Sequence, residues 1–188
     1  MVMPEPKRDI LNVKRLLAAA LLYFALARIA GAAIAEPPGY ASPLWPAAGV
    51  AMALCVRWRG FAPALGIMLG SALNNGYIAW SAGHAVGRAF SIGSLIGLGA
   101  AAQSVAGGGL LRRYWTLTGP GFARAAGLMA LACIANAAWG PLVLLCAGLG
   151  GENLAWTMFT WWVGDFIGCC VVVMPSLVLL DGGAHGEA

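Results

Sequence analysis

The sequence predicts an all-α polytopic membrane protein, a transmembrane bundle of about six helices with both termini in the cytoplasm. Composition and hydropathy support this prediction. Of the 188 residues, 61% are hydrophobic and 10% are charged, whereas an ordinary soluble domain carries about 25% charged residues. The apolar residues form several long runs, and each helical crossing of the hydrocarbon core requires roughly 20 residues of that kind.

Proline, glycine and arginine separate the apolar runs and set the predicted helix ends. The first run ends at the Glu-Pro-Pro-Gly sequence of residues 36–39. The second begins at Pro43 and is short for a full crossing, so we expect it to start in the membrane interface, with Trp45 as an anchor. The predicted helices cover residues 13–35, 43–56, 61–80, 88–111, 122–148 and 155–180.

The positions of the lysines and arginines predict the orientation of the bundle. In an alternating plan of six helices, nine of the eleven basic residues fall on one side and only Arg88 falls on the other. The positive-inside rule therefore predicts a cytoplasmic N-terminal segment (1–12), a transmembrane domain (13–180) and a cytoplasmic tail (181–188). The nine are Lys7, Arg8, Lys14, Arg15, Arg57, Arg59, Arg112, Arg113 and Arg124.

The same residue types argue against several function classes. The net charge of +4 comes from residues that orient helices, so we expect no nucleic-acid partner. His84 lies in a predicted loop and His185 in the tail, which leaves a haem without axial ligands inside the bundle. There is no metalloprotease motif, phosphate loop or catalytic triad, and we expect no enzymatic activity and no cofactor. The five cysteines form no C-x-x-C pair and are interpreted as packing residues: Cys55, Cys133, Cys146, Cys169 and Cys170.

Three pairs of glycines spaced four residues apart predict close helix packing, since each pair places two small residues on one helix face. We expect the packing to be intramolecular, with homodimerisation as the alternative. The pairs are Gly66/Gly70, Gly93/Gly97 and Gly164/Gly168.

Polar side chains inside the predicted helices indicate a candidate site, because such groups cost a few kcal/mol in lipid unless they are paired. Asp165 lies about ten residues, roughly 15 Å, into its helix. Other polar groups lie mostly in the outer halves of other helices. We therefore predict one cavity, open to the periplasm, for a small amphipathic or aromatic ligand. Its predicted lining is Asp165, Trp161, Trp162, Trp45, Asn74, Asn75 and Arg28. The alternative is a purely structural role, with an ion pair between Arg28 and Asp165.

Two tryptophan motifs resemble those of the membrane-associated sensor (MASE) family. Residues 42–51 read SPLWPAAGVA, which is similar to the family signature S-x-L-W-P-x-x-G-h-A, where h is hydrophobic. Residues 161–168 read WWVGDFIG, which looks like W-W-h-G-D-x-x-G, and Pro175 follows at the expected interval. Residues 91–94 and 110–113 are similar to the middle segment of the family. The resemblance covers roughly residues 13–180.

The resemblance implies an integral membrane sensory module of bacterial signalling proteins, located in the inner membrane. The family pattern continues with two more helices and an output domain such as a histidine kinase or diguanylate cyclase, and the 188 residues contain neither. We therefore expect a shortened sensor that contacts membrane lipid. It is a minimal stand-alone member, a fragment, or a protein that signals through a separate partner protein. The alternative is a six-helix substrate-binding component of a vitamin-type transporter, with the Gly66/Gly70 face docking to a transport partner. A third possibility is an anchoring subunit.

Overall fold

The computed structural model describes residues 5–34, 42–116, 120–150 and 153–182 of the chain. Within these ranges every secondary-structure element is a helix, which confirms the predicted fold class. Residues 36–39, His185 and most of the predicted tail lie outside the described residues. The six helices are α1 (Glu5–Ala33), α2 (Pro46–Arg57), α3 (Phe61–Ser81), α4 (Val86–Tyr114), α5 (Gly121–Cys146) and α6 (Leu154–Gly182).

Helix length and hydropathy agree with a multi-pass membrane protein. In the described part of the chain, α1, α4, α5 and α6 are each long and apolar enough to cross a bilayer. The 21 residues of α3 would also reach across a hydrocarbon core of about 30 Å. Its two asparagines, Asn74 and Asn75, lower the hydropathy of this helix. The 12 residues of α2 extend only about 18 Å, so α2 is a half-length helix.

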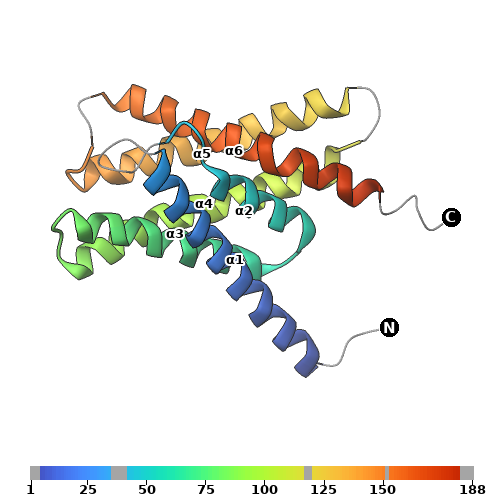
Figure 1. The fold of residues 1–188 in the computed structure, drawn as a ribbon, viewed down its shortest axis with the longest axis horizontal. Helices are drawn as coiled ribbons and strands as arrows, with labels where there is room; N and C mark the ends of the chain where they lie inside the picture. The colour runs from blue at the N-terminus through green and yellow to red at the C-terminus, as the bar shows by residue number, and fades with distance from the viewer. Residues whose placement is uncertain (1–4, 35–41, 117–119, 151–152, 183–188) are drawn as a thin grey trace.

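The helix ends segregate the basic residues (Figure 1). The start of α1, the ends of α2, α4 and α6, and the start of α5 lie at one end of the bundle. That end carries Arg57 at the last residue of α2 and Arg112 and Arg113 in the last turn of α4. Arg88, in the first turn of α4, lies at the opposite end. This arrangement fits the charge bias on which the predicted orientation rests.

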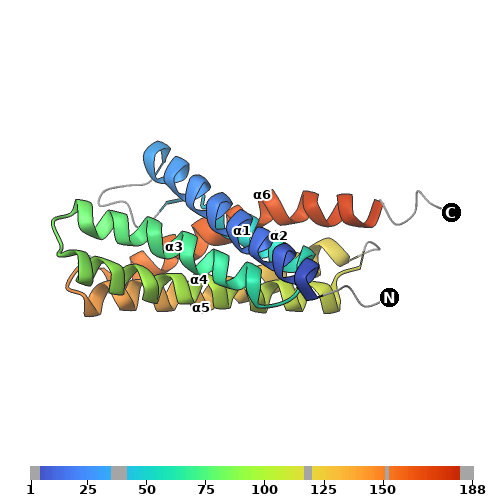
Figure 2. The same cartoon turned by 90° about the horizontal axis from the view of Figure 1, so that it is seen from below.

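Glycines bring the helices into close contact, and all three predicted pairs pack within the chain. A methyl group at Gly66 or Gly70 would overlap the backbone of α1, and one at Gly93 or Gly97 would overlap the backbone of α3. Helix α3 therefore lies between α1 and α4, as Figure 2 shows from below. Because the Gly66/Gly70 face is covered by α1, it is not free to dock to another protein.

The start of α2 differs from the prediction. Helix α2 begins at Pro46 rather than Pro43, and Trp45 is its N-cap residue. Proline suits this first helical position because its missing N–H would have no partner there. The backbone N–H of Trp45 donates a hydrogen bond to the carbonyl oxygen of Gly164 at 3.0 Å, ten residues into α6, or roughly 15 Å. Trp45 is thus not an interface anchor but lies deep in the bundle. Non-helical backbone is tolerated at that depth only where protein or a polar cavity surrounds it.

The other end of α2 is held by α4. The guanidinium of Arg112 donates to the carbonyl oxygen of Cys55, in the last turn of α2. Gly108, one turn earlier on α4, packs closely against the backbone of Cys55. A cation at a helix C-terminus satisfies a free carbonyl and is favoured by the helix dipole. Helix α2 is therefore fixed at its start by α6 and at its end by α4.

Candidate functional site

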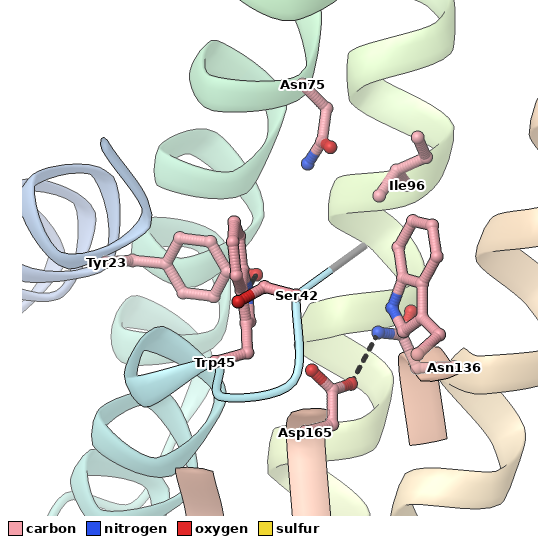
Figure 3. Close-up of a pocket in the computed structure, with 8 residues that line it drawn as sticks. Tyr23, Ser42, Trp45, Asn75, Ile96, Asn136 and Asp165 are labelled. Carbon is pink, nitrogen blue, oxygen red and sulfur yellow. Dashed lines mark hydrogen bonds between the residues drawn. The ribbon is translucent and has the colours of Figure 1, made fainter. Parts of the chain in front are cut away.

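A small polar cavity lies in the middle of the bundle (Figure 3). Its volume is about 20 Å³, counted as space open to the centre of a water molecule. About 10–15 Å³ on that measure holds one water, so the cavity has room for one or two. Every helix or the segment leading into it supplies a lining residue. The lining residues are Tyr23 (α1), Ser42 and Trp45 (before α2), Asn75 (α3), Ile96 (α4), Asn136 (α5), and Trp161 and Asp165 (α6).

The carboxylate of Asp165 lies at one wall of this cavity and is held by amides. Asp165 is 2% exposed. The Nδ2 group of Asn136 donates to its Oδ2 at 3.1 Å, and the side-chain amide of Gln103 on α4 lies beside the carboxylate. Within the described ranges no lysine, arginine or histidine forms an ion pair with Asp165. The two amides orient the carboxylate without neutralising its charge.

The two tryptophan motifs meet at the cavity. Gly164 lies against the backbone of Ser42, and Gly168 lies against the backbone of Trp45. On the facing side, Gly49 of α2 lies against the backbone of Gly168. A side chain at any of these glycines would overlap the opposing backbone. The motif residues thus build one tight contact between α6 and the segment that starts α2, and they place Trp45 and Asp165 in the same cavity.

Four of the seven predicted site residues line this cavity, namely Asp165, Trp161, Trp45 and Asn75. Trp161 and Asp165 are one turn apart on α6 and share a face. Gly140 of α5 lets the ring of Trp161 pack closely against its backbone. The structure thus brings together predicted residues from α3, α6 and the start of α2.

Trp162 does not line the cavity. Its Nε1 donates to the carbonyl oxygen of Ala130 on α5 at 2.9 Å, and its ring stacks on Phe166 with centroids 5.6 Å apart. Successive residues of a helix point about 100° apart. Trp162 therefore faces α5 when Trp161 faces the cavity, so the structure does not place it in the predicted lining.

Asn74 and Arg28 also lie outside the cavity lining. Asn74 is fully buried, and neither its Oδ1 nor its Nδ2 has a partner within the described residues. The guanidinium of Arg28 lies over the ring of Tyr77, 4.4 Å from its centroid. Arg28 follows Tyr23 by five residues, which turns it about 140° away from the cavity. The alternative of an ion pair between Arg28 and Asp165 is therefore not what the structure forms.

Sequence reasoning missed four lining residues, Tyr23, Ser42, Ile96 and Asn136. Asn136 was available from the sequence as a polar residue in the middle of an apolar run, and Ser42 as the first residue of a tryptophan motif. Ile96 and Tyr23 have no distinguishing pattern, because each is one apolar or aromatic residue among many on its helix.

A larger hollow lies between α4 and α5 toward the end of the bundle that carries Arg88. Its volume is about 420 Å³, and its lining is almost wholly apolar, with Leu95, Trp139 and Leu142 among its residues. The Nε1 of Trp139 donates to the carbonyl oxygen of Leu95 at 2.7 Å. The Arg88 guanidinium, at the rim, donates to the carbonyl oxygen of Ala147. Because these polar groups already donate to backbone carbonyl oxygens, the hollow has few free polar groups that could recognise a ligand.

The chain is thus an all-helical, multi-pass membrane protein with a polar cavity at the centre of its bundle. Comparison with protein families matches residues 15–185 to MASE1, the membrane-associated sensor domain. The chain belongs to the MASE1 family, whose members are membrane sensory domains of signalling proteins, and it is a multi-pass inner-membrane protein. Comparisons with curated proteins and with solved structures gave no match.

Proposed function

We propose that the chain is the input module of a bacterial signalling system, which binds its ligand in the Asp165 cavity and catalyses no reaction itself. One observation supports this proposal: all six helices, or the segments leading into them, contribute a residue to the cavity lining. A single bound species would therefore contact the whole bundle. It would favour whichever helix arrangement it fits better, which is the thermodynamic requirement for a sensor.

Helix α6 is the proposed transmitter. A ligand in the cavity would contact Ser42 and Trp45 on one side and Asp165 on the other. It would thus bridge the contact where Gly164 and Gly168 lie against the start of α2. Beyond Asp165, α6 continues for 17 residues to Gly182, roughly 26 Å. A shift or rotation of α6 at the cavity would reach that end, which we propose to be cytoplasmic.

A bound ligand is favoured over a purely structural role by the pattern of unpaired polar atoms. Structural polar clusters in native proteins pair nearly all of their buried groups. Here the Oδ1 of Asn136 and the Oε1 of Gln103, both beside Asp165, have no partner in the described part of the chain. The transporter alternative loses its docking face, because α1 covers Gly66 and Gly70.

The ligand must be small, or the cavity must widen to admit it. Sites for drug-sized ligands usually measure about 300–1,000 Å³, far above the 20 Å³ present here. A small amphipathic or aromatic ligand, as predicted from the sequence, would need the contact between α6 and the start of α2 to open.

Distance measurements test the proposed coupling of cavity and α6. Spin labels would be placed at Arg57 and Val178, which are both exposed, in a chain with its native cysteines replaced. We expect Asp165→Leu to shift the distance distribution between the labels. Ile167→Ala is the matched control. It changes a partly exposed residue of α6, two positions after Asp165, and should leave the distance distribution unchanged. Equal distributions for wild type and Asp165→Leu would show that the cavity does not control α6.

Co-purification from native membranes tests the proposed partner. A histidine kinase or a diguanylate cyclase retained by the full chain would support a signalling role. An ATP-driven transport module retained in its place would favour the transporter alternative.

A further inference from the structure

We propose that the Asp165 cavity binds one dehydrated monovalent cation, such as Na⁺, K⁺ or ammonium. This inference deepens the proposed function, on which it rests in taking the cavity as the input site. It starts from charge. Asp165 is 2% exposed and lies about 16 Å along a membrane helix, where an ionised side chain is costly unless it is paired. The amide of Asn136, which donates to it, and the amide of Gln103, which lies beside it, are both neutral, so one positive charge is needed for neutrality.

Three polar groups of the lining direct their donors to other groups of the protein. The Nδ2 of Asn75 donates to the carbonyl oxygen of Ser71 at 2.9 Å and to its hydroxyl at 3.2 Å. The hydroxyl of Ser42 donates to the carbonyl oxygen of Leu44 at 2.9 Å. The Nε1 of Trp45 lies 3.5 Å from the hydroxyl of Tyr23, to which it donates.

Asn75 and Ser42 therefore present oxygen to a ligand, with one lone pair of the Ser42 hydroxyl taken by the backbone N–H of Leu44 at 3.4 Å. An amide whose nitrogen is occupied presents its carbonyl oxygen, and a hydroxyl whose hydrogen is occupied presents lone pairs. Figure 3 shows Asn75, Ser42 and Asp165 around a common space. Two neutral donors of the lining have no acceptor among the hydrogen bonds of the described residues, the indole N–H of Trp161 and the hydroxyl of Tyr23, which itself accepts from Trp45. A negative carboxylate with neutral oxygen acceptors suits a hard cation.

Size and charge then select the class of cation. The volume of about 20 Å³ admits a bare ion or one or two waters and excludes an organic amine with several carbons. One carboxylate balances one positive charge. Among the described residues there is no group of three histidine, cysteine or acidic side chains that could hold a metal ion, as a transition-metal or calcium site would require. Aromatic rings of the lining add a favourable surface for a cation.

Ion-specific stabilisation of the purified full chain tests the inference. The protein would be kept in N-methyl-D-glucamine chloride, whose cation is too large for the cavity, and titrated with Na⁺, K⁺ or ammonium at constant ionic strength. A ligand that binds only the folded state raises the unfolding midpoint by mass action. We expect one of the three to raise it with saturation, and radioactive sodium or rubidium binding to give one site per chain.

Variants separate this site from general salt effects. Asp165→Asn should abolish the ion-specific rise, whereas Asp9→Asn, which removes an exposed carboxylate from α1, should retain it. Asn75→Leu should weaken cation binding roughly tenfold, and the neighbouring Asn74→Leu, outside the lining, should not. If Asp165→Asn does not fold, the comparison of Asn75→Leu with Asn74→Leu still tests the inference.

Two results would overturn the inference. One is the absence of any response above that of N-methyl-D-glucamine, which would mean that Asp165 is carried in its neutral, protonated form. The other is an equal response in wild type and in both cavity variants. In either case a shift of α6 in the spin-label experiment would leave the proposed sensor function standing and would reject only the cation.

Discussion

The backbone N–H of Trp45 donates to the carbonyl oxygen of Gly164 at 3.0 Å, and this bond joins the two most distinctive motifs of the sequence. The carbonyl belongs to the interior of α6. It can accept from the segment before α2 only because Gly164 has no side chain to hold that segment away. The motifs are separated by more than 100 residues, yet they form one contact beside the cavity.

The first prediction concerns the glycines of that contact. Alanine normally stabilises a helix by about 1 kcal/mol relative to glycine. At Gly168 a methyl group would overlap the carbonyl oxygen of Trp45, and overpacking of this kind costs about 1–3 kcal/mol. We therefore expect Gly168→Ala to lower the thermal unfolding midpoint in detergent.

Gly127→Ala provides the matched control. Gly127 lies inside α5 with open space where its Cβ would be, so this substitution should leave the midpoint unchanged or raise it. If Gly168→Ala behaved like Gly127→Ala, the close approach of α6 and the start of α2 would be wrong.

The second prediction concerns the partner of Asp165. The hydrogen bond from Asn136 measures 3.1 Å, and hydrogen bonds to charged groups contribute about 1.5–3 kcal/mol. In a double-mutant cycle of unfolding free energies, Asn136→Ala and Asp165→Asn should therefore be non-additive. Arg28→Gln and Asp165→Asn should be additive, because Arg28 contacts Tyr77 and not Asp165. A strong coupling energy in the cycle with Arg28 would show that Arg28 and Asp165 form an ion pair after all.

The helices and the main site residues could be predicted from the sequence, because lipid imposes a strong constraint. In lipid a segment must hydrogen-bond its backbone polar groups internally, which a helix does, so long apolar runs predict the positions of the helices. A carboxylate cannot face lipid, so Asp165 indicates the bundle interior. The two tryptophan motifs added Trp45 and Trp161, and both line the cavity.

What the sequence could not predict depends on helix rotation and on irregular backbone. Asn74 and Asn75 are equally polar, but only the rotation of α3, fixed by Gly66 and Gly70 against α1, decides which one reaches the cavity. A helix that starts at Pro43 predicts Trp45 at the membrane interface. The extended segment before Pro46 carries it to the middle of the bundle instead.

The third prediction concerns Arg28, whose guanidinium lies 4.4 Å from the ring centroid of Tyr77. A cation–π contact of this kind contributes about 0.5–2 kcal/mol, depending on desolvation. Tyr77→Leu should therefore lower the unfolding midpoint, whereas Tyr77→Phe, which keeps the ring, should cost much less. In an Arg28→Gln background the two Tyr77 variants should become similar. A persistent difference there would assign the effect to the tyrosine hydroxyl.

The fourth prediction is the orientation in the membrane. Reporter fusions after Arg59, Arg113 and Ala188 should report the cytoplasm, and a fusion after Gly83 should report the periplasm. The reason is the charge bias of nine basic residues to one. The half-length α2 does not alter the alternation, because its end carries Arg57 to the same end of the bundle as the end of α4. A periplasmic signal from the fusion after Ala188 would contradict this topology.

The fifth prediction is that the cavity opens toward the periplasm, and the neighbouring residues Asn74 and Asn75 provide a matched comparison. Asn74 and Asn75 are adjacent on α3 and both buried, but only Asn75 lines the cavity. In a chain without native cysteines, Asn75→Cys should react with a small impermeant thiol reagent added from the periplasmic side, and Asn74→Cys should not. A cysteine at His84, which lies between α3 and α4, gives the rate for a fully accessible loop.

The closed cavity holds only one or two waters, so we expect the cysteine at position 75 to react far more slowly than the loop control. Its rate would then measure how often α6 and the start of α2 separate, and Gly168→Ala, which wedges them apart, should increase it. If position 75 reacts no faster than position 74 in either background, the cavity does not open toward the periplasm, and its ligand must be small enough to reach it through the closed bundle.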